Sequence, residues 1–311
     1  MEYCSVPQLS GKISRICLGT MLFGNPVAEP EAIALTHAAM ERGVNFIDTA
    51  DIYEGYDRSI GSHGGVAERI LGRALRGKRD KVIIASKVGN ATGPGPDDQG
   101  LGRKHVGSTL EAILKRLGTD YLDIYYMHKM DPATPLEESI ETFAGLVEQG
   151  KSRAWGVSNF SAEAIREIVV LCRRNGWPLP AMSQPNYSIL RRDIEADHLP
   201  VCREAGIAVV PYRVLEGGLL SGKYAKSAPP PTGSRQAEKP GWLMEIDDAA
   251  QERLDAVRRS AATLKMPMSR YAIAWVLSRP GVAAAVVGVK NLQQLDEAVA
   301  AAGATSSLLA E

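Results

Sequence analysis

Eight short apolar segments recur along this 311-residue chain, and a longer segment with helical periodicity follows each of them. Such alternation is typical of parallel strands joined by crossover helices. Eight strands close a barrel, whereas six or seven would favour an open, doubly wound sheet. The sequence therefore predicts an α/β fold, namely a (β/α)8 TIM barrel. We expect its eight parallel strands at residues 14–19, 45–50, 81–87, 123–128, 153–157, 181–184, 208–212 and 284–288.

The segments between these runs carry residues that commonly begin or end helices. Thr134 and Glu137 stand on either side of Pro135 in the pattern of a capping box, which predicts a helix start. Gly118 follows an apolar periodic segment and is expected to end a helix. Asn291 is expected to cap the last helix, because its side chain can accept a hydrogen bond from the first turn.

The domain organisation follows from the unbroken alternation of strands and helices. Neither an internal repeat nor a linker interrupts it, so we expect residues 1–311 to form a single barrel domain with a short β segment at its N-terminus. Two stretches, residues 90–102 and 221–242, are irregular and rich in glycine and proline. Long loops of this kind are commonly functional lids. Plain surface insertions are the alternative interpretation.

Composition limits the classes of partner. The chain has 36 basic and 36 acidic residues and no net formal charge, so neither a nucleic acid nor an anionic membrane surface is expected to bind it. No segment reaches the ~20 apolar residues that span a bilayer, and the first ten residues do not resemble a signal peptide. The four cysteines form no C-x-x-C pair and fit free thiols in a reducing compartment, which predicts a cytoplasmic protein.

Polar residues stand where several predicted strands end. Asp48, Lys87 and His128 lie at three such ends, and Tyr53 follows shortly after the first of them. The carboxyl ends of barrel strands meet on one face, where barrel enzymes carry their chemistry. Each residue alone has a plain structural explanation, such as a helix cap, a packed loop aromatic or a core histidine. Lys87 is harder to explain this way, because a buried lysine needs an anion and Asp48 lies on the neighbouring strand.

Together these four residues fit the reduction of a carbonyl group. A tyrosine has an ordinary pKa near 10, and an adjacent ammonium group lowers it. Asp48 would hold Lys87 charged and in place, and His128 would orient the substrate oxygen. The reaction needs a proton for the oxygen, from a group such as Tyr53, while a cofactor delivers hydride to the carbon.

Three motifs connect these residues to a known family. The sequence GVNFIDTA from Gly43, which continues to Tyr53, resembles the GxNFxDTAxxY signature of the aldo-keto reductase superfamily. The sequence LGTDYLD from Leu117, which leads to His128, is similar to the RLxxDYxDLxxxH segment of that family. The sequence GVSNF from Gly156 is similar to its GxSNF strand end. The resemblance covers nearly the whole chain and extends to potassium-channel β-subunit-like and bacterial members.

The resemblance implies roles for individual residues. Tyr53 would be the general acid/base, tuned by Lys87 and Asp48, and His128 would orient the carbonyl. The cofactor would be NADP(H), with NAD(H) the less favoured alternative, because a cation at Lys290 and the helix start at Asn291 would suit a 2′-phosphate. The residues predicted to contact the cofactor lie at its nicotinamide, its pyrophosphate and its adenosine end. They are Gly19, Thr20, Met21, Asp48, Ser158, Asn159, Gln184, Tyr212, Arg213, Leu215, Gly218, Lys223, Gly288, Lys290, Gln294 and Glu297.

Some positions depart from the family pattern. Arg213-Val214 replaces the usual Ser-Pro, and the arginine is expected either to reach the pyrophosphate or to point into the substrate mouth. Lys290 and Ala298 stand where serine and asparagine are common. We expect residues 54–64 and 221–242 to cover the substrate. A polar rim suggests a hydroxyl-rich or otherwise polar substrate, and its residues are Tyr56, Arg58, His63, Lys129 and Arg213.

Three functions fit these observations to different degrees. An NADP(H)-dependent reductase acting on a small-molecule carbonyl or alcohol substrate, such as an aldehyde, ketone or sugar, fits best, and a homo-oligomer is compatible with it. A cofactor-binding regulatory subunit that resembles potassium-channel β subunits is the alternative. A metal-dependent hydrolase is disfavoured and no metal site is expected, because His63, His105 and His198 fall in helices or loops rather than at strand ends.

Overall fold

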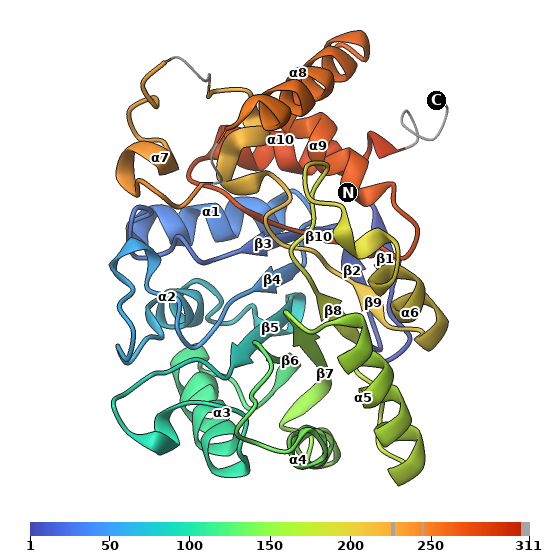
Figure 1. The fold of residues 1–311 in the computed structure, drawn as a ribbon. Helices are drawn as coiled ribbons and strands as arrows, with labels where there is room; N and C mark the ends of the chain where they lie inside the picture. The colour runs from blue at the N-terminus through green and yellow to red at the C-terminus, as the bar shows by residue number, and fades with distance from the viewer. Residues whose placement is uncertain (225–227, 244–245, 306–311) are drawn as a thin grey trace.

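A barrel of eight parallel strands forms the centre of the molecule, and helices surround it (Figure 1). The structure, a computed structural model, describes residues 1–224, 228–243 and 246–305. All eight predicted strands are present in it, with ends that differ from the expected ones by a few residues. In chain order they are β3 (Ile16–Gly19), β4 (Phe46–Asp48), β5 (Ile83–Val88), β6 (Leu122–Met127), β7 (Ser152–Ser158), β8 (Met182–Gln184), β9 (Ala208–Val209) and β10 (Ala285–Gly288).

Hydrogen bonds between the segments that contain the last two strands close the barrel. The sheet runs β10-β3-β4-β5-β6-β7-β8-β9, so β9 and β10 stand at its two ends. The amide of Ala283 donates to the carbonyl of Val209 at 2.8 Å, and the amide of Val286 donates to the carbonyl of Pro211 at 2.9 Å. The predicted (β/α)8 barrel is therefore confirmed. That residues 1–311 make up a single domain stays a prediction.

An N-terminal hairpin covers one end of the barrel. Its strands β1 (Tyr3–Ser5) and β2 (Lys12–Ser14) pair in antiparallel fashion, which confirms the short β segment expected there. Val6 and Ile13 are fully buried with Phe46 and Ile124 of the barrel strands. Burial of these apolar side chains closes the end of the barrel opposite the carboxyl ends of the strands.

Helices follow the strands in the expected order. They are α1 (Glu29–Glu41), α2 (Val66–Ala74), α3 (Arg103–Leu117), α4 (Leu136–Glu148), α5 (Ala162–Asn175), α6 (His198–Ala205), α7 (Arg235–Glu238), α8 (Asp248–Thr263), α9 (Met268–Leu277) and α10 (Leu292–Ala302). The helix ends at Gly118 and Asn291 are confirmed: Gly118 adopts φ 67°, and the Asn291 side chain accepts from the amide of Gln294. The capping box at Thr134 is wrong, because its hydroxyl donates to Asp131 and Pro135 takes the cap position.

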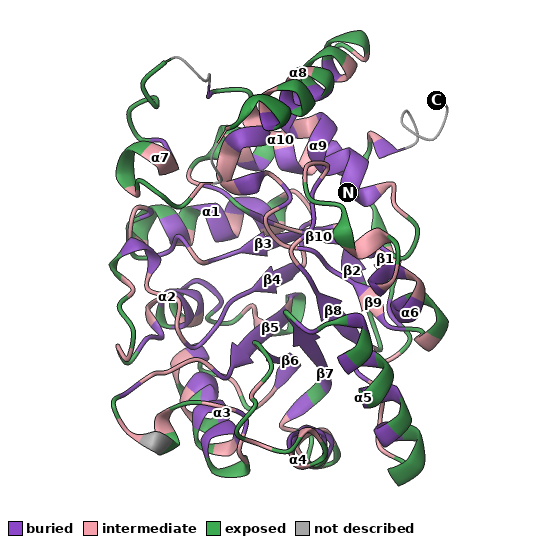
Figure 2. Cartoon of the chain, in the orientation of Figure 1, coloured by how far each residue is buried: buried purple, intermediate pink, exposed green. Residues whose placement is uncertain are grey.

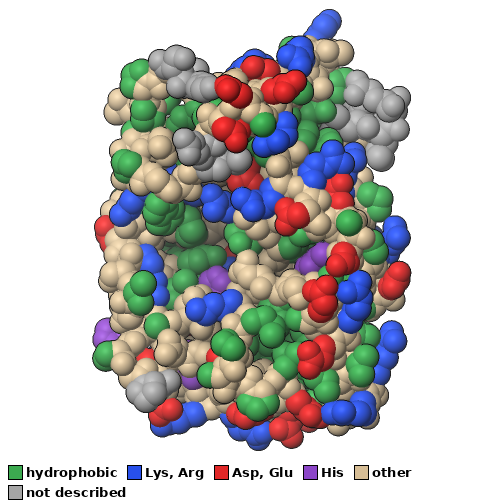
Figure 3. All heavy atoms as spheres, in the orientation of Figure 1, with side chains coloured by type: hydrophobic (Ala, Val, Ile, Leu, Met, Phe, Trp, Pro, Cys, Tyr) green, Lys and Arg blue, Asp and Glu red, His purple; other side chains and the backbone are tan. Residues whose placement is uncertain are grey.

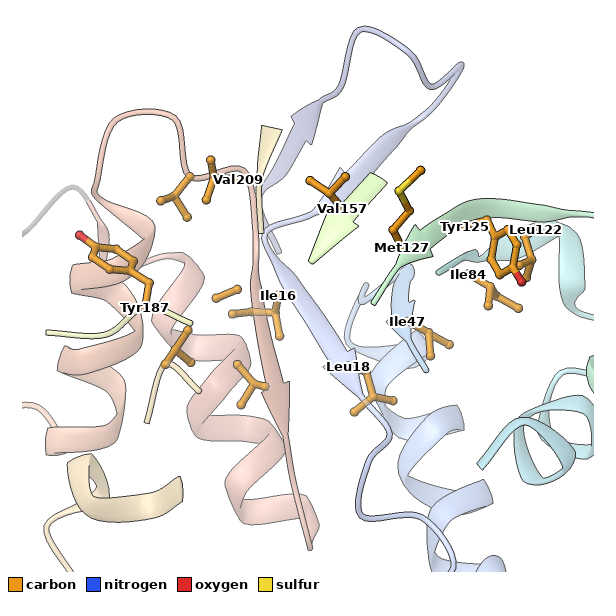
Figure 4. Packing of buried hydrophobic residues seen from close by; sticks show 14 of the residues in the cluster. Ile16, Leu18, Ile47, Ile84, Leu122, Tyr125, Met127, Val157, Tyr187 and Val209 are labelled. Carbon is orange, nitrogen blue, oxygen red and sulfur yellow. The ribbon is translucent and has the colours of Figure 1, made fainter. Parts of the chain in front are cut away.

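Two apolar layers hold the barrel together. Side chains on the outer face of the strands pack against the helices, and Figure 4 shows part of this layer, including Leu18 and Ile47. The helices are buried toward the strands and exposed outward (Figure 2). Inside the barrel, Gly156 leaves room for the ring of Tyr126: a Cβ there would lie 2.6 Å from Tyr126 Cε1 and 2.7 Å from the carbonyl of Met182. Glycine is therefore required by packing at this position.

The two irregular stretches lie beside the carboxyl ends of the strands. Residues 90–102 contain one 3-10 turn (Pro96–Asp98). The stretch 221–242 includes α7, while residues 225–227 lie outside the part that the structure describes. None of the helices in the described part of the chain combines the length and the hydrophobicity needed to span a bilayer.

Candidate active site

The barrel brings the four predicted catalytic residues together. Asp48 is the last residue of β4, and Lys87 lies in β5, its neighbour in the sheet. His128 follows β6 directly, and Tyr53 lies in the turn after β4. The parallel register places all four at the carboxyl ends of adjacent strands.

A fully buried ion pair forms the base of the site. The Lys87 ammonium lies 2.5 Å from Asp48 Oδ1, donates to the carbonyl of Thr49 at 2.9 Å, and donates to the Tyr53 hydroxyl at 3.1 Å. Burial alone would lower the pKa of Lys87, but the Asp48 carboxylate and the Tyr53 hydroxyl raise it above its usual range. Lys87 therefore stays charged, with all three of its donors satisfied.

The Tyr53 hydroxyl is held in its protonated form. Burial raises the pKa of Tyr53 above the ordinary value, and the charge of Lys87 offsets this only in part. The sequence predicts a pKa lowered by the lysine, and the net direction in the structure is the opposite. The reason is that the phenolate loses more hydration in the barrel mouth than one ammonium restores. A protonated hydroxyl beside an ammonium suits a proton donor.

His128 stands edge-on to Tyr53 and is neutral. The two ring centroids are 6.2 Å apart at an interplanar angle of 79°. Burial, and then the positive charges of Lys87, Lys129 and Arg58, hold the pKa of His128 well below its usual value. A neutral imidazole keeps one donor and one acceptor nitrogen, and Nδ1 has no partner within the described residues. The ring also lines the cavity described below, where it can contact a bound molecule.

A second hydrogen-bonded group lies beside these residues, at the ends of the next strands. Gln184 Nε2 donates to Asp48 Oδ2 at 2.7 Å, which links β8 to the buried ion pair. The Tyr212 hydroxyl donates to Asn159 Oδ1 at 2.7 Å, and the Ser158 hydroxyl donates to the carbonyl of Gln184 at 2.9 Å. Asn159 adopts φ 61°, a left-handed conformation that asparagine tolerates. These contacts fix several amide and hydroxyl groups in one place.

One cavity of about 660 Å³ runs from this group toward α10. Most of the predicted catalytic and cofactor residues line it. Thr20 and Lys87 do not, because both lie behind the wall and bond Asp48 or its neighbours. The predicted residues in the wall are Gly19, Met21, Asp48, Tyr53, His128, Ser158, Asn159, Gln184, Tyr212, Arg213, Leu215, Gly218, Lys223, Gly288, Lys290, Gln294 and Glu297.

Comparison with known proteins identifies the family of the chain. The family model described as the aldo/keto reductase family matches residues 15–307. The chain belongs to this family. A probable voltage-gated potassium channel subunit beta of Oryza sativa subsp. japonica is 32% identical over 305 residues, which cover 96% of this chain and 90% of that protein.

Two further relatives carry oxidoreductase names. The uncharacterized oxidoreductase YrpG of Bacillus subtilis is 33% identical, with 97% of this chain and 91% of that protein covered. L-glyceraldehyde 3-phosphate reductase of Escherichia coli is 31% identical, with 90% and 81% covered. Members of the aldo/keto reductase family generally use NAD(P)H and act on small-molecule carbonyl substrates. Family membership and these names support oxidoreductase activity.

Several residues that line the cavity of this aldo/keto reductase were not predicted from the sequence. Two of them, Arg235 and Trp242, come from the stretch 221–242, which the sequence marked as a loop without indicating which side chains face the cavity. Ser269 of α9 also lines the wall and donates to Glu297. The others are mainly apolar: Leu22, Ile52, Val214, Gly217, Ser221, Ile273, Val286, Val287, Val289 and Ala298.

The polar rim is largely engaged with the protein itself. The Arg58 guanidinium donates to the carbonyls of Ala91 and Ser62, and Tyr56 is buried against Trp242. Arg213 donates to the carbonyl of Trp242 at 3.1 Å. Of the five predicted rim residues, Arg213 alone lines the cavity. Among the predicted rim residues, only Arg213 therefore supports the prediction of a polar substrate.

Charge around the cavity differs from the charge of the rest of the molecule. Basic and acidic side chains are interspersed over the visible face (Figure 3). Four cations, Arg213, Lys223, Arg235 and Lys290, nevertheless line the same cavity. Within residues 1–224, 228–243 and 246–305, no three or more His, Cys, Asp or Glu side chains come together as a possible metal site.

Proposed function

We propose that this aldo/keto reductase transfers hydride between NADP(H) and the carbonyl or alcohol carbon of a small aldehyde, ketone or sugar-like molecule. The contact between the Tyr53 hydroxyl and the Lys87 ammonium, 3.1 Å apart beside the cavity, carries the proposal. It supplies a proton donor next to a stabilising positive charge. When bound, the cofactor would supply the hydride.

In reduction, Tyr53 acts as the general acid. Its hydroxyl donates a proton to the substrate oxygen as negative charge develops there, and Lys87 stabilises the phenolate that remains. Asp48 keeps Lys87 in place and charged through the buried ion pair. His128, neutral and edge-on to Tyr53, donates a hydrogen bond that orients the same oxygen. Oxidation of an alcohol uses the same groups in reverse.

The nicotinamide end of the cofactor is assigned to the hydrogen-bonded group beside Asp48. Ser158, Asn159 and Gln184 offer amide and hydroxyl groups that complement a carboxamide. Tyr212 lines the same wall and offers an aromatic face for the ring. Gly19, Met21 and Asp48 complete this end, with Thr20 behind the wall bonded to the carbonyl of Asp48, and Arg213, Leu215 and Gly218 are assigned to the pyrophosphate.

The other end of the cavity favours NADP(H) over NAD(H). Lys223 and Arg235 line it, and neither pairs with a carboxylate in the described part of the chain. Unpaired cations in a cavity favour an anionic group such as a 2′-phosphate. Gly288, Gln294 and Glu297 are assigned to the adenosine. Lys290 lies at the same end, where its ammonium pairs with the Glu238 carboxylate.

A fluorescence titration tests this proposal. We expect the purified chain to bind NADPH at least about tenfold more tightly than NADH, because a charge-assisted pair contributes on the order of 1.5–3 kcal/mol. Turnover in a panel of carbonyl compounds should follow. Equal binding of both cofactors would contradict the phosphate assignment, and binding of neither would contradict the oxidoreductase assignment.

A regulatory role is the second candidate, because relatives in a plant and a yeast are named as potassium channel β subunits. Such a subunit would bind the cofactor without needing turnover. Co-purification with a membrane protein, together with no turnover across a broad carbonyl panel, would favour it. Rapid turnover by the isolated chain would favour the enzyme. The physiological direction, the substrate and homo-oligomer formation are open to the same experiments.

A further inference from the structure

A buried carboxylate, that of Glu68, lies behind the catalytic residues and has no part in the proposed proton transfer. Glu68 stands in the first turn of α2 and is excluded from solvent. Its Oε1 accepts from the Ser86 hydroxyl of β5 at 2.6 Å, and its Oε2 accepts from Arg116 Nε of α3 at 2.6 Å. One side chain thus joins α2 to the neighbouring α3 and to a barrel strand (Figure 1).

The residues next to these partners reach the proton donor. The amide of Ala67, which precedes Glu68, donates to the carbonyl of Tyr53 at 3.0 Å. Ser86 directly precedes Lys87 in β5, so the two side chains point to opposite faces of the sheet. The Lys87 ammonium in turn donates to the Tyr53 hydroxyl at 3.1 Å. These contacts form a closed circle, in which Glu68 connects the backbone of Tyr53 with the strand of Lys87.

Arg116 keeps Glu68 in this arrangement. Its side chain is only 18% exposed and packs on the start of α2, where Gly65 adopts φ 74° and a Cβ would collide with the Arg116 side chain. Burial, and then the charge of Glu68, raise the pKa of the nearby Asp51 well above its usual value, so Asp51 is neutral. Arg116 therefore has one buried charge to balance, that of Glu68.

A second buried carboxylate holds the opposite end of the same strand. Asp123 accepts from the guanidinium groups of two arginines and from the amide of Ile84 at 2.9 Å. Ile84 lies near the start of β5, at the end of the strand remote from the catalytic residues. Glu68 and Asp123 thus have the same kinds of partner, but Glu68 holds the end that carries Lys87.

We propose that Glu68 is a positioning residue for the reduction, because its carboxylate holds the Lys87 ammonium against the Tyr53 hydroxyl through the circle of contacts. This inference rests on the proposed function. Glu68 does not line the cavity, so it acts through other residues. Without its carboxylate, β5 and the turn of Tyr53 lose their common link, and the ammonium and hydroxyl groups move apart. Such a displacement slows proton transfer and leaves the assigned cofactor contacts in place.

Glu68→Ala in the full chain tests the inference in a single turnover with NADPH and the carbonyl compound that the wild-type chain reduces fastest. We expect hydride transfer to slow about 10- to 100-fold, while NADPH affinity and the substrate KM stay within about twofold of wild type. Glu68→Gln should recover most of the rate. Its amide has the same size, its oxygen can accept from Arg116, and its nitrogen can donate to the Ser86 hydroxyl.

Asp123→Ala is the matched control, because it also removes a buried carboxylate that bonds an arginine and β5. Both alanine variants should unfold at lower denaturant concentration than wild type, but Asp123→Ala should keep hydride transfer within about twofold. Ser86→Ala breaks one contact of the circle and should slow hydride transfer about five- to tenfold. Combined with Glu68→Ala, it should add nothing further, because both substitutions remove the same link.

Three results would overturn the positioning role. They are equal slowing in Asp123→Ala, normal hydride transfer in Glu68→Ala, and a loss of NADPH affinity that parallels the loss of rate. Should either alanine variant fail to fold, Ser86→Ala decides: slower transfer with normal NADPH affinity supports the role, and an unchanged rate overturns it. Absence of hydride transfer by the wild-type chain would instead overturn the proposed function, which survives if only the positioning role fails.

Discussion

The two ends of the cavity are built in different ways. At the catalytic end, Asp48, Lys87 and Gln184 come from three barrel strands, are buried, and bond one another directly. At the other end, residues 228–243, which we call the strap, carry Arg235 and Glu238, and Glu238 pairs with the partly exposed Lys290. Breaking a buried ion pair costs about 3–5 kcal/mol, whereas an exposed pair contributes about 0.2–1 kcal/mol. The fold thus holds the buried residues of the catalytic end firmly and the strap loosely.

This difference fits the tasks that we assign to the two ends. Proton transfer requires hydroxyl and ammonium groups in a constant arrangement, because a misplaced group loses the benefit of orientation. Exchange of a cofactor requires a part of the wall that can move. The strand register satisfies the first requirement, and the strap satisfies the second.

The largest effect should follow from Lys87→Met. The substitution leaves Asp48 buried without its counter-ion, which should lower the free energy of unfolding by about 3–5 kcal/mol. It also removes the charge that stabilises the phenolate of Tyr53, so turnover should fall about 10²–10⁴-fold. Chemical denaturation and steady-state kinetics measure the two effects.

Lys81→Met is the matched control for this variant, because Lys81 is exposed just before β5 and pairs with no acid in the described part of the chain. Its stability and turnover should stay close to wild type. If Lys87→Met were equally mild, the catalytic end would not depend on the buried pair, and the contrast between the two ends would disappear.

The sequence alone could predict that the residues of the catalytic end meet, because a barrel places the ends of consecutive strands side by side. Asp48, Lys87 and His128 each end or follow a predicted strand, so their meeting follows from the eight-strand pattern. The pKa of Tyr53 could not be predicted in this way. Its direction depends on how far burial outweighs the charge of Lys87, which requires the folded arrangement.

The pH dependence of reduction should be broad. Reduction needs protonated Tyr53, whose pKa is raised, and neutral His128, whose pKa is lowered. The rate kcat/KM should therefore stay level from about pH 6.5 to about pH 10, the ordinary values of the two groups. Above that range it should fall about tenfold per pH unit as Tyr53 loses its proton.

A pH–rate profile with saturating NADPH checks this expectation. A fall in kcat/KM already between pH 7 and pH 8 would show that Lys87 lowers the pKa of Tyr53 more than burial raises it. An acidic limb above pH 6.5 would contradict the neutral His128. Either outcome would change the electrostatic description of the catalytic end.

A smaller and more selective effect is expected from the strap. Arg235→Ala should weaken NADPH binding about tenfold and leave NADH binding almost unchanged, because it removes a charge assigned to the 2′-phosphate. Lys239→Ala removes the same charge from the same segment at a position outside the cavity wall, and serves as the control. Equal weakening of both cofactors would mean that Arg235 acts by holding the strap in place.

The strap was the part that the sequence described least well. Its glycines and prolines marked residues 221–242 as a loop, but they did not indicate that Arg235 and Trp242 face the cavity or that Glu238 meets Lys290. Loops lack the periodicity that tells which side of a strand or helix is buried. Glu238 and Lys290 are 52 positions apart in the sequence, so their contact could be found only in the folded structure.

Tyr53→Phe, examined in a single turnover, tests the central claim most directly. The variant loses one hydroxyl and keeps the ring, Lys87 and the cavity wall. We predict that NADPH binds with wild-type affinity while hydride transfer to a carbonyl substrate slows about 10²–10⁴-fold. Hydride transfer at a near-normal rate would contradict the account, because another group would then have to supply the proton.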